Sequence, residues 1–348
     1  PPPPPFQAED GIRDIVARLV GSEMCIRDRI HTLPALTDAT SAHPELRFDW
    51  VVEEAFSEVP GWHPAVERVI PIALRRWRKR PFSSFGGPEW REFRRSLAVA
   101  HYDRVIDAQG LIKSAFVARM ARAPVYGFDR HSARESAAAL AYRYKIPVPR
   151  QLHAVERTRQ LFARVLDYPL PTGTGDYGVR AQMPVVGGDR EPSLLFFHGT
   201  ARPEKLWPED HWVALARQAG SHGYPVWLPW GSDAEHRRAE AIAAAVDNAQ
   251  ALPKLDLLGL ASLLLEVQGS VAVDTGLGHL AAALDVPSVS LYGPTSTELI
   301  GSYGGNQVHL VSPLASEAGA KPGAMMAAIA PDTVWQALEP LLPAGTPT

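Results

Sequence analysis

The sequence predicts an α/β protein made of two doubly wound halves, each a parallel sheet covered by helices on both faces. Short apolar runs alternate with helix-forming segments along most of the 348 residues, which is the pattern that parallel sheets require. The chain is also longer than the roughly 250–300 residues at which a single core stops growing. A Gly-, Pro- and Thr-rich stretch at 168–190 is the best linker candidate. We therefore expect one half at 28–180, a second at 181–330, and a final helix and tail at 331–348.

In the first half, β-branched and apolar runs indicate strands, and longer runs of helix formers indicate helices. Strands are expected at residues 46–52, 66–72, 104–107 and 125–128. Helices are expected at residues 31–39, 89–100, 111–120 and 152–166. Residues 130–144 are either helical or a loop.

The second half repeats this alternation more regularly. Strands are expected at residues 194–197, 224–228, 271–273 and 308–311, with one more ending before Gly293. Helices are expected at residues 208–219, 234–246, 256–267, 280–284 and 331–342. Strand–helix–strand units in this order predict parallel pairing with right-handed crossovers.

The first 27 residues are expected to lie outside the native fold. The chain begins with five prolines, and residues 7–14 and 22–29 resemble translated sequencing-adaptor read-through. The segment contains neither an apolar h-region nor a small-residue cleavage site, the two features that identify a signal peptide. We therefore expect residues 1–27 to be a non-native segment, and the first strand of the first half to be missing or replaced.

Composition excludes several classes of protein. A hydrophobic content of 46% with 21% charged residues is typical of globular proteins, and no apolar run reaches the roughly 18 residues of a membrane-spanning helix. The single cysteine, Cys25, excludes a disulfide framework. A net charge of −3 argues against a general nucleic-acid binder.

Positive charge is nevertheless concentrated in one segment. Eight Arg and Lys residues lie between Arg75 and Arg95, against Glu89 and Glu92. Such a patch suits an acidic ligand or an anionic membrane surface. A solvated loop and helix face is the alternative interpretation.

The segment 269–293 is the most informative for function. Its apolar strand stops at Asp274-Thr275-Gly276, a helix follows, and a second strand ends at Gly293. In parallel sheets ligands bind beyond the carboxyl ends of the strands, where a helix N-terminus offers free N–H groups to an anion. An ordinary strand–helix turn capped by Asp274 is the alternative.

Two further strand ends carry polar residues that can reach the same ligand. The strand at 194–197 leads to Thr200 and Lys205, and the strand at 224–228 leads to Glu235. Thr200 and Lys205 suit a diphosphate, and Glu235 suits a ribose diol or sugar hydroxyls. For Lys205 taken alone, a solvated loop lysine is the competing interpretation. Together the three loops predict a phosphate-containing ligand.

Other chemistries find no support in the sequence. It lacks a phosphate-binding Gly-x-x-x-x-Gly-Lys-Ser/Thr loop, a Gly-x-Gly-x-x-Gly turn after the first credible strand and a Gly-x-Ser-x-Gly elbow. Its 12 histidines form no His-Glu-x-x-His pair. No Asp-x-Asp pair is present to hold a metal on a nucleotide-sugar diphosphate. We therefore expect neither a metal nor a cofactor.

From residue 31 to about 342 the chain resembles the lipopolysaccharide heptosyltransferases. The motifs that carry this resemblance are residues 31–38, 48–54, 65–71, 75–79, 107–110, 153–159, 228–231, 273–277 and 291–295. The family consists of inverting glycosyltransferases of the GT-B fold, in which two Rossmann-like domains face a central cleft, and its type I enzymes are the nearest group. The resemblance implies metal-independent transfer of L-glycero-D-manno-heptose from ADP-heptose to the first Kdo of Kdo2-lipid A. It also implies a cytoplasmic enzyme held peripherally at the anionic inner-membrane surface.

The resemblance also assigns roles to residues. The second half would bind ADP-heptose through Thr200, Lys205, Glu235, Leu255, Asp274, Thr275, Gly276 and His279. In the first half, the acceptor's carboxylates and phosphates would be held by Arg75, Arg76, Arg78, Lys79 and Arg134. Lys205 would stabilise the departing ADP in place of a metal.

The general base falls on Asp28, three residues before His31, where the family carries its catalytic Asp. Arg27 replaces the Gly that the family has before it. Three other functions remain open at this point: transfer to a later core sugar, nucleotide-sugar binding without turnover, and epimerisation of a nucleotide sugar.

Overall fold

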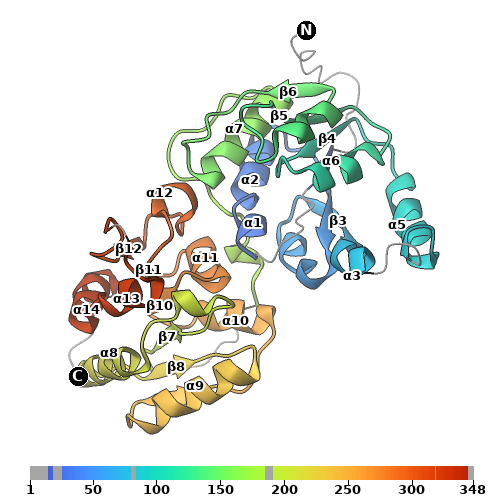
Figure 1. Ribbon diagram of the computed structural model, residues 1–348. Helices are drawn as coiled ribbons and strands as arrows, with labels where there is room; N and C mark the ends of the chain where they lie inside the picture. Colours follow the sequence, from blue (N-terminus) through green and yellow to red (C-terminus); the bar gives the residue numbers. More distant parts are fainter. Residues whose placement is uncertain (1–14, 19–25, 80–83, 185–190, 318, 344–348) are drawn as a thin grey trace. The chain divides into compact units, whose positions relative to one another are not determined.

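The computed structural model describes residues 15–18, 26–79, 84–184, 191–317 and 319–343. Two compact units divide between Gln182 and Met183, two residues after the boundary expected from the sequence. Both units are built on a parallel sheet, so the predicted α/β class is confirmed (Figure 1). Several parts of the sequence predictions lie outside the described residues: 1–14 and 19–25 of the segment expected to be non-native, Arg80 of the basic segment, the 185–190 end of the linker and 344–348 of the tail.

The first unit contains a six-stranded sheet in the order β3-β2-β1-β4-β5-β6. Its strands are β1 (Ile15–Arg18), β2 (Phe48–Glu53), β3 (Val66–Ile72), β4 (Arg104–Asp107), β5 (Val125–Phe128) and β6 (Tyr144–Ile146). All neighbouring pairs are parallel. The strands predicted at 66–72, 104–107 and 125–128 are present with those bounds.

A strand is present at Ile15–Arg18, where the first strand was expected to be missing or replaced, and its replacement stays a prediction. Strand β1 lies at the centre of the sheet, with Ile15 paired to Phe48 of β2 on one side and to Arg104 of β4 on the other. Strand β1 lies within residues 1–27, which were expected to be a non-native segment. A four-residue β-branched and apolar stretch at 15–18 can supply the backbone hydrogen bonds that both neighbours need. The non-native origin of residues 1–27 stays a prediction.

Helices flank the first sheet. The α-helices are α1 (Ile26–Ile30), α2 (Leu33–Ala42), α3 (Leu74–Lys79), α5 (Pro88–Ala98), α6 (Ile112–Arg119) and α7 (Ala154–Leu166). Short 3-10 turns are η1 (Glu54–Phe56), η2 (Val59–Trp62), η3 (Ser136–Ala141) and η4 (Arg180–Gln182). The ambiguous stretch 130–144 therefore contains a 3-10 turn and leads into the edge strand β6.

Helices α2 and α7 pack together around a buried ion pair. Arg159 is 1% exposed, and its Nε donates to Asp38 Oδ2 at 2.6 Å. A second carboxylate, Glu156, accepts from Arg159 Nη1 at 2.7 Å. The pair holds two helices that lie more than a hundred residues apart in the sequence.

Asp38→Asn is expected to lower the free energy of unfolding by about 3 kcal/mol, because it leaves the buried Arg159 guanidinium with only one carboxylate, Glu156, to balance its charge. Urea unfolding followed by fluorescence measures it. Arg95→Ala, which breaks an exposed pair with Glu92, is the matched control and should cost less than about 1 kcal/mol. Equal effects of the two changes would contradict a stabilising role for the buried pair.

The second unit repeats the strand order of the first. Its strands are β7 (Leu194–Phe197), β8 (Val226–Leu228), β9 (Ala249–Ala251), β10 (Gly269–Val273), β11 (Ser288–Tyr292) and β12 (Gln307–Val311). They form a parallel sheet in the order β12-β11-β10-β7-β8-β9. Counted from its own first strand, each unit therefore has the order 3-2-1-4-5-6, which is the dinucleotide-binding arrangement of doubly wound folds.

The core of the second unit is aromatic and aliphatic. Trp207 and Trp212 are fully buried beside Phe196, and Trp335 closes the same cluster. The helices of the unit are α8 (Glu209–Ser221), α9 (Asp233–Ala244), α10 (Leu257–Leu264), α11 (Gly276–Ala283), α12 (Thr297–Ile300), α13 (Pro322–Ala327) and α14 (Pro331–Leu338), with 3-10 turns η5 (Pro203–Lys205) and η6 (Glu339–Leu341). None of the helices in the described ranges is long and apolar enough to cross a membrane.

Each sheet has one point where the strand order reverses, and ligands bind at such points. In the first unit it lies between β1 and β4, and in the second between β7 and β10. The residues that follow these four strands are therefore the ones to inspect.

Candidate functional site

The centre of the site in the second unit is an ion pair between Lys205 and Asp274. Lys205 ends η5 in the connection after β7, and Asp274 directly follows β10. Both are 7% exposed, and Lys205 Nζ donates to Asp274 Oδ2. Burial alone would raise the pKa of Asp274, but hydrogen bonds from Lys205 and Thr295 outweigh it and hold that pKa below its usual value. The pair places a cation and an anion at the switch point.

The N-terminus of α11 lies beside this pair. Thr275 is the N-cap residue and its side chain makes no capping bond, while Gly276 begins the helix. The backbone N–H groups of this first turn are therefore available to an anion. His279 is 2% exposed, and its charge helps to lower the pKa of Asp274. The structure thus brings together five residues predicted to bind the donor: Lys205, Asp274, Thr275, Gly276 and His279.

The loops after β7 and β8 meet at Glu235. Its Oε2 accepts from the backbone N–H groups of Gly231 at 2.9 Å and Ser232 at 3.0 Å, as part of a capping box at the start of α9. A Cβ on Gly199 would lie 2.5 Å from Glu235 Oε1, so a larger residue there would force the Glu235 side chain to move. Thr200 follows that glycine, and its Oγ1 accepts from Arg202 N at 3.4 Å. One carboxylate oxygen of Glu235 thus accepts hydrogen bonds from the backbone, a structural role that the sequence had not predicted.

Leu255 lies just before α10, in a half-buried position. The neighbouring residues Lys254 and Trp230 contact one another, with Lys254 Nζ 5.5 Å from the Trp230 ring centre. Trp230 Nε1 donates to Leu252 O at 2.6 Å and its ring stacks on His236 at 4.0 Å. This loop presents an apolar and aromatic surface, which is the type of wall that a nucleobase needs.

His198 lies between the core and this site. It is fully buried, and burial together with the charge of Arg238 lowers its pKa to about 4. In the first unit His63, also buried, has a pKa of about 4. Both rings are therefore neutral near neutral pH.

Lowering the pH from about 7 to about 5 is expected to reduce the free energy of unfolding by about 2 kcal/mol for each of these histidines. Between pH 6.5 and 4 the unfolded chain binds the proton that the native ring refuses, so stability is present above this window and is lost as the pH falls through it. Urea unfolding of His198→Gln and His63→Gln at the two pH values should show a shallower pH dependence than the parent. An unchanged slope in both variants would contradict the assignment.

In the first unit, Asp28 lines a small cavity. Its other lining residues are His31, Thr32, Ala108, Gln109, Phe128, Arg134, Ala154, Arg157 and Thr158. Arg134 Nη1 donates to Asp28 Oδ2 at 3.5 Å, and Arg27 lies 3.6 Å from the other oxygen. Burial alone would raise the pKa of Asp28, but the charges of Arg134, Arg27 and Arg29 hold it below the usual value. Two predicted residues, Asp28 and Arg134, are thus in contact.

The sequence predictions missed two residues of this cavity. Gln109 belongs to the 107–110 motif, for which no role was assigned, and it lies two residues beyond the end of β4 at the switch point. Arg157 lies within the 153–159 motif on α7. Spacing alone carried no signal for either, because the cavity joins segments that are distant in the sequence.

The first four charges of the basic segment, Arg75 to Lys79, lie in α3 after β3, and its last three lie in α5. Arg75 N donates to the buried Glu53 at 3.2 Å, which anchors the start of the helix. Arg76 is paired with Glu54 at 3.1 Å and with Glu89 at 2.8 Å, so its charge is compensated. Arg78 and Lys79 are exposed, and no ion pair involves them among the described residues. Within α3, Arg78 and Lys79 are therefore the charges most accessible to an anionic ligand.

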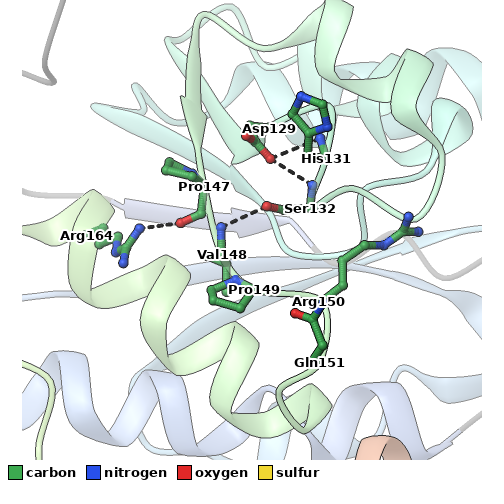
Figure 2. Close-up of a pocket in the computed structure, with 9 residues that line it drawn as sticks. All are labelled: Asp129, His131, Ser132, Pro147, Val148, Pro149, Arg150, Gln151 and Arg164. Atoms are coloured by element: carbon green, nitrogen blue, oxygen red, sulfur yellow. Dashed lines mark hydrogen bonds between the residues drawn. The ribbon is translucent and has the colours of Figure 1, made fainter.

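A second, larger cavity of about 450 Å³ lies in the same unit, lined by the loop after β5, the connection between β6 and α7, and Arg164 near the end of α7. Figure 2 shows Asp129 turned toward the backbone of His131 and Ser132, while the Arg150 guanidinium extends away from it. Arg150 Nη2 donates to Arg134 O at 3.4 Å, which links this cavity to the residues around Asp28. In the described part of the chain, no group of three His, Cys, Asp or Glu residues is placed to hold a metal ion.

The comparison with protein families decides the membership of the chain. The family described as glycosyltransferase family 9 (heptosyltransferase) matches residues 90–325. This chain belongs to that family. The family 9 chain is 54% identical to lipopolysaccharide heptosyltransferase 1 of Pseudomonas aeruginosa over 286 residues, covering 82% of this chain and 81% of the relative. It is 48% identical to the enzyme of the same name from Escherichia coli K12, covering 81% and 89% of the two chains.

Solved structures agree with this membership. The E. coli heptosyltransferase WaaC with ADP matches the family 9 chain with a TM-score of 0.86 and 42% identity, over 94% of this chain and 99% of that one. The same enzyme with ADP-2-deoxy-2-fluoro heptose matches with a TM-score of 0.83 and 41% identity, over 94% and 99%. The chain is thus a glycosyltransferase, and the GT-B class expected from its motifs is confirmed.

Proposed function

We propose that this family 9 protein is a type 1 lipopolysaccharide heptosyltransferase, which transfers L-glycero-D-manno-heptose from ADP-heptose to the first Kdo of Kdo2-lipid A with inversion at the anomeric carbon. The observation that carries the proposal is the 54% identity to a protein of that name over four fifths of both chains. The pairing of Lys205 and Asp274 at the switch point of the second unit supports it independently.

The second unit has the chemistry to bind the donor. The diphosphate of ADP-heptose carries negative charge that the Lys205 ammonium and the first N–H groups of α11 can accept. When the bond between the anomeric carbon and the diphosphate breaks, that charge grows on the leaving oxygen. Fixed donors placed at this point stabilise the transition state more than the ground state. The WaaC structures, which hold ADP and an ADP-heptose analogue, support this assignment.

The first unit has the chemistry to bind and activate the acceptor. Asp28 takes the proton of the attacking Kdo hydroxyl, and the oxygen of that hydroxyl forms the new bond to the anomeric carbon as ADP departs. Because the pKa of Asp28 is lowered, the carboxylate is ionised and ready to accept a proton at neutral pH. Arg134 orients it, and the free charges of Arg78 and Lys79 suit the acceptor's carboxylates and phosphates.

The surface around Arg78 and Lys79 supports peripheral binding to an anionic membrane. Next to Arg78 and Lys79 lies an aromatic cluster in which Trp77 contacts Phe85, Trp90 and Phe93. Phe85 is 40% exposed. Cations beside exposed aromatic rings are the combination that interfacial anchors use. Sedimentation with vesicles that contain anionic lipid, compared with zwitterionic vesicles, tests this part of the proposal.

The activity itself is tested by ADP release from ADP-heptose. Release should require Kdo2-lipid A, and an acceptor that already carries the first heptose should not replace it. Release with the later acceptor only would point to a different core sugar, and conversion of ADP-heptose without any acceptor would indicate an epimerase. Binding of ADP-heptose with no release in any mixture would overturn the proposal.

A further inference from the structure

The cavity beside Asp28 is small and polar. Its volume is about 30 Å³, which is the space of one water molecule or one arm of a larger ligand. Four of its lining residues, His31, Gln109, Arg134 and Arg157, carry side-chain N–H donors, and Asp28 carries the carboxylate. The cavity therefore suits a single polar substituent held against the proposed base.

The side chain of Gln109 is buried and has no partner. The residue is 4% exposed, and neither Nε2 nor Oε1 makes a hydrogen bond within the described part of the chain. Leaving such a group unpaired costs about 1–3 kcal/mol. An amide in this state is an unusual feature of a folded protein, and it points to a ligand that supplies both a donor and an acceptor.

The backbone beneath Gln109 is firmly held, so its side chain has a fixed origin. Gln109 N donates to Asp107 Oδ1 at 2.9 Å. Asp107 is itself fully buried and accepts from Ser114 Oγ and Tyr142 Oη, each at 2.7 Å. This network positions the amide at the switch point without using its polar atoms.

A second unpaired donor lines the same cavity. Arg157 Nε is buried without a partner among the described residues, while Arg157 Nη2 donates to Ser132 O. Burial and the nearby positive charges of Arg134 and Arg150 lower the pKa of Arg157, although Asp28 already pairs with Arg134. An anionic group in the cavity would relieve that repulsion.

We propose that Gln109 is a specificity-determining residue that reads the acceptor as a sugar acid: its amide N–H donates to the acceptor carboxylate, and its amide oxygen accepts from a neighbouring hydroxyl. The carboxylate also meets Arg157 Nε, so both unpaired donors find an acceptor. The substituent that enters the cavity lies beside Asp28 and so fixes the sugar ring near the base. This inference rests on the proposed acceptor, and it adds a contact that selects an acidic sugar over a neutral one.

The test compares Gln109→Met with the parent on two acceptors, Kdo2-lipid A and its analogue with the first Kdo carboxyl reduced to an alcohol. Met keeps the shape of Gln and removes both polar atoms. We expect the KM for Kdo2-lipid A to rise about tenfold or more, and the preference for the acid over the alcohol to fall by a similar factor. The KM for ADP-heptose should stay within about twofold. Gln160→Met, at a half-buried glutamine of α7 that does not line the cavity, is the matched control.

Stability separates this role from a structural one. Because Gln109 has no partner in the free protein, Gln109→Met should leave the thermal midpoint unchanged or raise it. A lower midpoint with an unchanged acid-to-alcohol preference would overturn the inference, and it would mean that the amide holds only a water molecule. Calorimetric titration of free Kdo into parent and variant gives a readout without turnover. Equal affinities would overturn the inference while leaving the proposed function intact. If the parent binds Kdo in a way that depends on Gln109 but releases no ADP, the Gln109 contact is supported and the proposed transferase function is refuted.

Discussion

Asp28→Asn is expected to lower kcat by roughly 10²–10⁴-fold, the range that general-base catalysis supplies. The amide keeps the size of the carboxylate and an oxygen for Arg134, but it cannot take the proton of the attacking hydroxyl. The KM for ADP-heptose should change little, because the proposed donor residues lie in the other unit. Steady-state ADP release at saturating substrates measures the effect. Asp103→Asn, at an exposed aspartate of the same unit, is the control and should behave as the parent.

The dependence on pH provides a second check on Asp28. Its pKa lies below the usual value because the charge of Arg134 and two other arginines outweighs burial. The acid limb of the kcat profile that belongs to Asp28 should therefore lie at lower pH in the parent than for an ordinary aspartate. Arg134→Ala removes the strongest of the lowering charges, so this limb should move to higher pH. A limb that stays in place, or an Asp28→Asn protein with parental kcat, would remove Asp28 from the role of base.

Lys205→Ala is expected to lower kcat by roughly 10²–10³-fold through lost stabilisation of the departing diphosphate. The change also leaves Asp274 buried without its cation, and breaking such a pair costs about 3–5 kcal/mol of stability. Loss of activity in this variant alone would thus mix catalysis with unfolding. Lys321→Ala, at an exposed lysine of the same unit, controls for the loss of a positive charge.

The double variant Lys205→Met with Asp274→Asn separates the two effects. It removes both charges, so much of the stability should return, whereas turnover should not. Thermal unfolding and ADP release on the same preparations make the comparison. If folded Lys205→Met protein releases ADP within about threefold of the parent rate at saturating substrates, then Lys205 stabilises no leaving group.

The regular elements of this fold were largely predictable from the sequence. The buried strands β4, β5 and β7 have the bounds that their apolar runs predicted. The two strands missed at the sheet edges, β6 and β9, have three residues each. A run of three residues is too short to show the alternation of apolar and polar residues that identifies a strand. The central strand β1 was missed for a different reason: its surroundings in the sequence resemble foreign read-through, and only the pairing to β2 and β4 identifies it.

The candidate site was predictable where a residue follows a strong strand. Asp274 and Lys205 were found because both lie in connections that begin at carboxyl ends of buried strands. The ion pair between them was not, since it joins residues 69 positions apart. Arg76 was expected to hold an acceptor anion, but two carboxylates from η1 and α5 already balance its charge. Gln109 was overlooked because an unpaired amide is visible only when its surroundings are known.

The pairing of Lys205 with Asp274 has a consequence for how the donor is held. In the proposed donor site Lys205 already pairs with Asp274, so a diphosphate would have to compete with that carboxylate for the ammonium. Because of this competition, Lys205 would bind the diphosphate of the donor, and later that of ADP, less tightly than a lysine without an anionic partner. As the leaving oxygen gains charge, it competes better with the carboxylate and draws the ammonium toward itself. A neighbouring aspartate can in this way convert a strong binding group into one that acts mainly in the transition state and lets the product go.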